Sequence, residues 1–167
     1  MLEVSCWVLF PGAMAFAGSM DLVTMTIPNR ISIVLVAGFF LLAPFVGMDV
    51  ERFALHLGVG AAVLCCTFGL FALGWIGGGD AKIFAAASLW MGFDFIGEFA
   101  MLAALAGGVL TFALLAFRGL ALPALLVQQD WIARLHHKAT GVPYGIAIAA
   151  AALMVYPSTP WLMATAS

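Results

Sequence analysis

The chain has 167 residues, of which 65% are hydrophobic and 8% are charged, and its mean hydropathy is +1.17. A soluble domain is about half apolar and about a quarter charged, so a soluble core of this size could not bury so much apolar surface. The net charge of −2 and the absence of any Lys/Arg run argue against nucleic acid as a partner. Composition therefore predicts a protein that uses the lipid bilayer as its solvent. No linker or repeat divides residues 1–167, and we expect one domain.

Apolar stretches of about 20 residues can cross a bilayer as helices. In chain order, six are predicted: Val4–Met20, Ile31–Met48, Phe53–Ile76, Asp80–Ile96, Phe99–Phe117 and a last one from Pro143 to about Tyr156. The fourth is long enough only if it begins at Asp80, with Lys82 reaching to the interface. Between the last two spans, Leu120–Lys138 alternates apolar and polar side chains at helical spacing, which predicts a helix on the membrane surface. The expected fold is all-α and polytopic, with about six spans and one interfacial helix.

Basic residues predict the orientation, because they gather on the cytoplasmic side of a membrane protein. If the chain crosses the membrane six times, Arg52 is the only basic residue on one side of the membrane. The basic residues on the other side are Arg30, Lys82, Arg118, Arg134 and Lys138. We therefore expect that side to be cytoplasmic, with both termini outside. The first span has no basic residue before it, so it is interpreted as a retained span and not as a signal peptide.

Two aspartates fall at the cytoplasmic edge: Asp21 ends the first span and Asp80 begins the fourth. Ionisable groups at membrane depth are costly, so such a pair suggests function, although a single aspartate at a helix end is often only interfacial. Two neighbouring carboxyl groups share one proton, so that one can activate a water while the other donates to a carbonyl under attack. This chemistry hydrolyses peptides and requires neither a metal nor a cofactor. No serine competes as nucleophile, since His56 is expected far from Ser88.

Three segments carry a family resemblance. Gly77-Gly78-Gly79-Asp80 is followed by Lys82, and Asp21 is followed by Ile27-Pro28-Asn29. The third segment is Val142-Pro143-Tyr144-Gly145-Ile146-Ala147. In this order they resemble the motifs of the type IV prepilin peptidases, which are Gly-x-Gly-Asp membrane aspartyl peptidases. The resemblance extends over about residues 15–155.

The resemblance implies an aspartyl endopeptidase that removes the short basic leader of prepilins at the cytoplasmic face of the bacterial inner membrane, typically after a glycine. It implies that Asp21 and Asp80 are catalytic, and that Gly77 and Gly79 let the backbone approach the substrate. Larger members carry an insert with paired CxxC motifs and methylate the new N-terminus. Here the loop after the first span has about ten residues and no cysteine, so methyl transfer is not expected. The compact form is similar to the peptidases of tight-adherence (Flp-type) pili, and some archaeal preflagellin peptidases are of similar size.

Other residues of these motifs have two interpretations. Gly78, Lys82, Pro28, Asn29, Pro143 and Tyr144 are candidates to support the site. Pro28 and Asn29 also suit a turn before a helix that begins at or just after Asn29. Pro143 suits the first turn of the last span, and a tyrosine beside it is common at the membrane interface. The oligomeric state stays open.

Two other functions compete with the peptidase. A proton-coupled transporter would use the aspartates as carriers, but transport sites usually lie near the midplane of inverted repeats, and no repeat occurs here. A non-catalytic assembly subunit of a pilus machine leaves the aspartates and the glycine run unexplained. Isosteric Asp→Asn changes distinguish these functions, because they abolish proteolysis and spare a scaffold.

Overall fold

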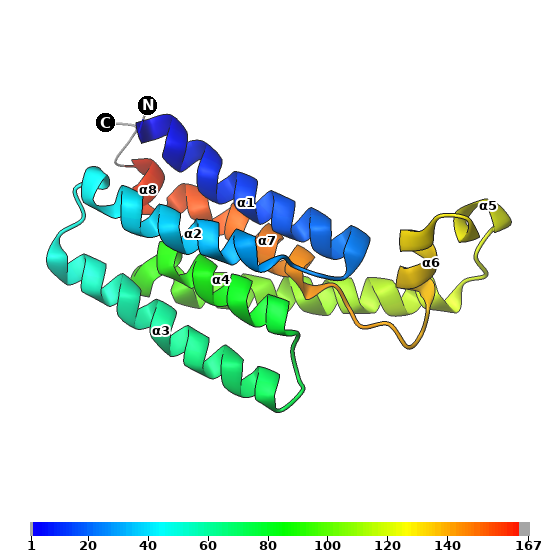
Figure 1. Cartoon of the computed structure of the whole chain (residues 1–167). Coiled ribbons are helices and arrows are strands. Elements are labelled where there is room, and N and C mark those ends of the chain that lie inside the picture. The colour runs from blue at the N-terminus through cyan, green and yellow to red at the C-terminus, as the bar shows by residue number, and fades with distance from the viewer. Residues whose placement is uncertain (1, 164–167) are drawn as a thin grey trace.

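The computed structural model describes residues 2–163, which form helices and connecting loops with no strand among them (Figure 1). The long helices are α1 (Leu2–Thr24), α2 (Asn29–Leu42), α3 (Val50–Ala72), α4 (Gly78–Gly119) and α7 (Tyr144–Val155). The short ones are η1 (Ala43–Val46), α5 (Ala124–Val127), α6 (Asp130–His136), η2 (Tyr156–Ser158) and α8 (Pro160–Met163). The prediction of an all-α protein is confirmed.

Four helical segments are long and apolar enough to cross a membrane: Ser5–Thr24, Asn29–Val46, Val50–Ala72 and Gly78–Gly119. A fifth, Tyr144–Ser158, is apolar but shorter. Many large side chains on these helices face outward, as Phe112 does with 79% of its surface exposed. A bilayer is the environment in which such a surface is stable, so the chain is a membrane protein.

Helix α4 contains two antiparallel arms, residues 78–91 and 93–119, that meet at Gly92 (Figure 1). Gly92 has a left-handed φ of 63° and a ψ of −169°, which breaks the helix. The rings of Phe84 and Phe99 stack with centroids 4.7 Å apart, whereas 15 residues of straight helix would separate them by about 22 Å. The two arms correspond to the predicted fourth and fifth spans. The predicted break between Ile96 and Phe99 is wrong, because glycine is the residue that adopts this φ without strain.

Two side chains cover the carbonyl groups that this break exposes. The last carbonyls of a helix lack partners within it. The His56 ring of α3 lies with Nδ1 2.6 Å from the Leu89 carbonyl oxygen, and the Trp161 indole of α8 donates to the Trp90 carbonyl over 2.8 Å. A Cβ on Gly92 would lie 2.5 Å from the His56 ring. The turn thus depends on a glycine at 92 and on a ring at 56.

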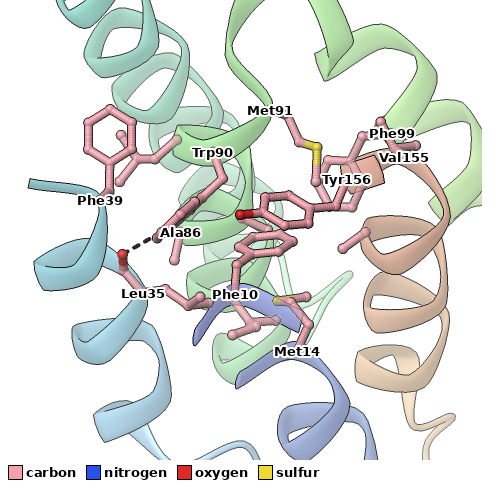
Figure 2. Close-up of a cluster of buried hydrophobic side chains, with 14 of the residues drawn as sticks. Phe10, Met14, Leu35, Phe39, Ala86, Trp90, Met91, Phe99, Val155 and Tyr156 are labelled. Carbon is pink, nitrogen blue, oxygen red and sulfur yellow. Dashed lines mark hydrogen bonds between the residues drawn. The ribbon is translucent and has the colours of Figure 1, made fainter. Parts of the chain in front are cut away.

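An aromatic core joins four helices at the end of the bundle that holds this turn (Figure 2). The fully buried Trp90 donates from its indole nitrogen to the Leu35 carbonyl of α2 over 3.0 Å. Its ring lies 5.2 Å from that of Phe10 in α1, which stacks at 4.3 Å on Tyr156 after α7. These contacts hold α1, α2, α4 and α7 together at one end. The opposite ends of α1, α4 and α7 form the site described below.

The segment after α4 differs from its prediction. One interfacial helix was expected over Leu120–Lys138, but the structure has two short helices, α5 and α6, that extend away from the bundle (Figure 1). Two arginines connect the segment to the long helices. Arg134 donates to the Val23 carbonyl of α1 over 2.9 Å, and Arg118 of α4 donates to the Leu135 carbonyl over 2.8 Å. The single predicted helix does not form because Gln129, between α5 and α6, has an extended backbone with a φ of −93° and a ψ of 108°.

Candidate active site

Asp21 lies in the last turn of α1 and is buried, with 5% of its surface exposed. Its carboxylate Oδ2 accepts a hydrogen bond from the backbone N–H of Gly145 over 2.8 Å. Gly145 is in the first turn of α7, where backbone N–H groups have no partner within the helix. The start of α7 therefore orients the carboxylate at the end of α1.

Asp80 is the third residue of α4, after the N-cap residue Gly77. From this position an acidic side chain can reach back to the N–H of the N-cap residue, as in a capping box. The Asp80 carboxylate interacts with the backbone N–H groups of Gly77 and of Gly145, and it interacts electrostatically with Asp21. The Gly145 amide therefore donates to Asp21 and lies near enough to Asp80 to interact with it. The predicted position of Asp80 in the first turn of a helix is confirmed.

The glycines of this region allow close contacts. A Cβ on Gly145 would lie 2.8 Å from Asp21 Oδ2 and 2.7 Å from Ile27 Cδ1. A Cβ on Gly77 would lie 2.9 Å from Asp80 Oδ2, and one on Gly79 would lie 3.3 Å from Ile27 Cβ. A Cβ on Gly78 would lie 3.1 Å from Phe71 Cε2. Gly79 lets the start of α4 lie close to the loop after α1, because a side chain there would press against Ile27.

The three helix ends lie at a common distance from the aromatic core. Asp21 follows Phe10 by 11 residues in α1, Asp80 precedes Trp90 by 10 residues in α4, and Gly145 precedes Tyr156 by 11 residues in α7. At 1.5 Å per residue, each separation is about 15 Å. The core therefore aligns three helices so that their far ends meet at one level. Tertiary packing produces the site from positions that are up to 124 residues apart.

The predicted supporting residues lie around this pair in different roles. Pro28 is the N-cap residue of α2 and Asn29 is its first residue, as predicted. Lys82 donates from Nζ to Asn29 Oδ1 over 3.0 Å, so it connects the starts of α2 and α4. Pro143 is not within the first turn of the last span, since it precedes α7 as its N-cap residue. Its φ of −75° and ψ of 80° explain why the helix begins one residue later.

Tyr144 begins α7 and packs on the second arm of α4. Its ring lies close to Gly107, where a Cβ would be 3.0 Å from Cε1, and its hydroxyl is 3.1 Å from Thr111 Oγ1. Tyr144 lines a pocket that Asp80 also lines. The structure thus brings it near the aspartates.

Other polar groups lie elsewhere in the described part of the chain. Asp94 and Glu98 are exposed at the start of the second arm of α4, the end opposite Asp80. His56 is closer to Ser88 than predicted, because it contacts the Leu89 carbonyl. The Ser88 hydroxyl donates to the Phe84 carbonyl over 2.8 Å, so it is paired within its own helix. Among the described residues, no three His, Cys, Asp or Glu side chains gather as metal ligands.

The comparison with protein families identifies the class of protein. The sequence model of the type IV leader peptidase family matches residues 8–112, which is more than half of the chain. The chain belongs to the type IV leader peptidase family. A search of curated proteins found no match, and a search of solved structures found none. The match includes both aspartates and the glycine run, and family membership makes the protein a membrane peptidase.

Two residues of the site were not among the site residues predicted from the sequence. Gly145 donates to Asp21, and Ile27 packs against both Gly79 and Gly145. Both are within the quoted segments that resemble the family, but a glycine or an isoleucine has no chemistry of its own that would mark it. Gly145 also lies beyond the part of the peptidase that matches the family. Its role is visible only once α7 is packed beside α1.

Proposed function

We propose that this peptidase is an aspartic endopeptidase that removes the leader peptide from prepilins of the Flp type, with Asp21 and Asp80 as the catalytic pair. The observation that supports it most strongly is the approach of both carboxyl groups to the amide of Gly145. Paired carboxyl groups hydrolyse peptides without a covalent intermediate. Family membership independently favours hydrolysis over the transporter and the assembly subunit.

The proposed reaction uses one ionised and one protonated carboxyl group. The ionised group takes a proton from a water, whose oxygen attacks the scissile carbonyl carbon. The protonated group donates its proton to the carbonyl oxygen, which stabilises the charge developing there. When the tetrahedral intermediate collapses, the C–N bond breaks, and the leaving nitrogen receives the proton that came from the water. The remaining hydroxyl proton returns to the second carboxyl group, so the pair is regenerated.

The proposed orientation places the site at the cytoplasmic face of the inner membrane, with both termini outside. Five of the six basic residues support this orientation, because they lie at the end of the bundle that holds the site or in the segment beyond it. They are Arg30 at the start of α2, Lys82 near the start of α4, Arg118 in the last turn of α4, Arg134 in α6 and Lys138 after α6. Arg52 lies in the first turn of α3, at the other end of the bundle. In this orientation a basic leader stays in the cytoplasm, and the apolar segment of the prepilin enters the bilayer beside α1 and α4.

The same proposal excludes methyl transfer. The connection between α1 and α2 is short, residues 25–28, and contains no cysteine. The three cysteines of the sequence are Cys6 in α1 and Cys65 and Cys66 in α3, within apolar helices. The paired CxxC motifs of the larger relatives therefore have no counterpart here.

The test is cleavage of a prepilin from the same genome by the purified protein in detergent. Wild type is compared with Asp21→Asn and Asp80→Asn, with and without a chelator, and S-adenosylmethionine is added to one series. Asp94→Asn is the matched control, because Asp94 is an exposed acid of α4 that lies just after the break at Gly92, at the end of the first arm opposite Asp80. Mass spectrometry reads the N-terminus of the product.

We expect wild type and Asp94→Asn to release the leader, with or without chelator, and to leave the new N-terminus unmethylated. Each Asp→Asn change at 21 or 80 is expected to remove cleavage, since neither carboxyl group can replace the other in the reaction. Cleavage that survives both changes would contradict the assigned pair. Loss of cleavage with the chelator would contradict a reaction that uses carboxyl groups alone.

A further inference from the structure

A pocket of about 540 Å³ opens on the outside of the bundle between α2, α3 and the first arm of α4. Both α2 and α3 pack against α4, and the pocket is a groove between them, the α2–α3 groove (Figure 1). Each of the three helices contributes four of the residues that line it. Asp80 is not one of these, since it lines a separate pocket beside Tyr144 of α7. The groove is therefore distinct from the proposed catalytic site.

The groove extends along the helices for about two turns. Lys82 and Leu89 mark its ends in α4, and Leu64 and Leu57 mark them in α3. The residues of each pair are seven positions apart, which is about 10 Å at 1.5 Å per residue. The hydrocarbon core of a bilayer is about 30 Å thick, so one leaflet accounts for about 15 Å. The groove therefore fits within one leaflet, on the side of Lys82, and is too short to hold a helix that crosses the membrane.

The body of the groove is apolar and open to the bilayer. Its floor contains the small, buried residues Gly60, Ala85 and Ala86. Its rim contains Ile33 and Leu64, with 64% and 47% of their surfaces exposed. A lipid chain gains no hydrophobic free energy by leaving other chains, but it supplies van der Waals partners to side chains that would otherwise lack them. The groove therefore suits an acyl chain that enters from the side.

Basic and polar groups gather at the end of the groove that is nearer the membrane surface. Lys82 is the one charged residue that lines the groove, and its Nζ donates to Asn29 Oδ1 over 3.0 Å. An ammonium group has more than one N–H donor, so this bond leaves donors for a further acceptor. Ser32 adds a hydroxyl group, and Arg30 lies in the same turn of α2. That turn contains no acidic residue, so this end of the groove favours a negatively charged group.

We propose that the α2–α3 groove binds one anionic phospholipid of the adjacent leaflet, with an acyl chain in the groove and the phosphate group at Lys82. The headgroup is held by the ammonium group, by the Ser32 hydroxyl and by the charge of Arg30. A zwitterionic phospholipid has no net charge, so it lacks the attraction that these basic residues exert on an anionic one. The binding involves no covalent step and is independent of the proposed function.

The experiment measures which lipid occupies the groove of the full-length protein in phosphatidylcholine nanodiscs. A trace of phosphatidylglycerol, or of phosphatidylcholine, carries a diazirine in one acyl chain, and illumination attaches it to the side chains that it contacts. Mass spectrometry of the digested protein gives the yield of label on the residues that line the groove. The yield from phosphatidylglycerol divided by the yield from phosphatidylcholine is the selectivity of the groove.

Two pairs of variants test the two parts of the site. Lys82→Met removes the charge, and Lys138→Met is its matched control, because Lys138 is an exposed lysine that does not line the groove. Ala61→Leu fills part of the groove, and Ala62→Leu is its matched control. Both alanines are exposed on α3, but only Ala61 lines the groove. Lys82→Arg keeps the charge and is included to separate it from the structural role of Lys82.

We expect a selectivity of about fivefold in wild type, since one basic residue near a membrane surface attracts an anionic lipid by about that factor. Lys82→Met is expected to lower the selectivity to about one, whereas Lys82→Arg and Lys138→Met keep it. Ala61→Leu is expected to lose groove label from both lipids, because it takes the space of the chain, and Ala62→Leu keeps the label. A folding defect in Lys82→Met would leave Ala61→Leu to decide.

Equal labelling by the two lipids in wild type would overturn the proposal, because the groove would then accept any lipid. A selectivity that survives Lys82→Met, or that falls equally in Lys138→Met, would overturn the role of Lys82. Groove label that is unchanged in Ala61→Leu would show that the chain lies elsewhere. Loss of the label on addition of a prepilin would assign the groove to the apolar segment of the substrate in place of a lipid.

Discussion

The backbone N–H of Gly145 donates to the carboxylate of Asp21 over 2.8 Å, across 124 residues of sequence. It fixes the rotamer of a buried acid with a group that belongs to another helix. Asp80 approaches the same amide from the start of α4. The amide of one glycine is thus the point at which α1, α4 and α7 meet.

Replacing Gly145 with alanine is expected to lower kcat by about 100-fold. The new Cβ would lie 2.8 Å from Asp21 Oδ2 and 2.7 Å from Ile27 Cδ1, so α7 or Asp21 must move. Misplacement of a catalytic group by about 1 Å typically costs about that factor. Cleavage kinetics of the purified variant measure it. Gly12→Ala is the control, because Gly12 is also helical and has open space around it; a loss of activity there would contradict the steric explanation.

Lys82 and Asn29 are expected to stabilise the protein as a pair. The Nζ–Oδ1 hydrogen bond of 3.0 Å connects the starts of α4 and α2. A double-mutant cycle of Lys82→Met and Asn29→Ala, followed by unfolding in mixed detergent, is expected to give a coupling free energy of about 0.5–1.5 kcal/mol. The bond is exposed, so the value belongs to the lower part of that range. Purely additive effects of the two substitutions would show that the bond contributes nothing.

Gly92→Ala is expected to lower the free energy of unfolding by about 2 kcal/mol or more. An alanine at a φ of 63° carries a strain of about 1–2 kcal/mol, and its Cβ would lie 2.5 Å from the His56 ring. Thermal unfolding of the detergent-solubilised protein measures the change. Gly97→Ala in the second arm of α4 is the matched control, since nothing lies within 4 Å of a Cβ there and alanine favours a helix. Equal stability of the two variants would contradict the strained turn.

His56→Phe is expected to destabilise the protein by about 1–3 kcal/mol while keeping an aromatic ring beside Phe39. The substitution leaves the stacking at 5.7 Å possible but removes the partner of the Leu89 carbonyl. The contact is partly buried, and an acceptor that loses its partner away from water costs about that much. The same unfolding assay measures it, and Phe40→Leu on an exposed face of α2 serves as the control for loss of an aromatic contact. A fully stable His56→Phe variant would show that the carbonyl needs no cap.

Several features were predictable from residues close together in sequence. The apolar stretches predicted the long helices, Pro28 and Asn29 predicted the start of α2, and the glycine run predicted that Asp80 begins a helix. The predicted helix boundaries were wrong where the backbone conformation of a single residue ends a helix. The break in α4 is at Gly92 and not after Ile96, because an apolar pattern does not reveal a left-handed φ. The segment after α4 forms two short helices for a similar reason, since periodicity alone does not show a turn at residues 128–129.

The sequence by itself determined the class of protein, since hydropathy and helix length are local properties, and it determined which acids lie at helix ends. Only the tertiary structure decided that Asp21 and Asp80 lie close enough to interact, and that the Gly145 amide donates to Asp21 beside them. The reason is the aromatic core: Phe10, Trp90 and Tyr156 align three helices, and their far ends converge about 15 Å away. Contacts between residues so far apart in the chain depend on how whole helices pack, which no local pattern records.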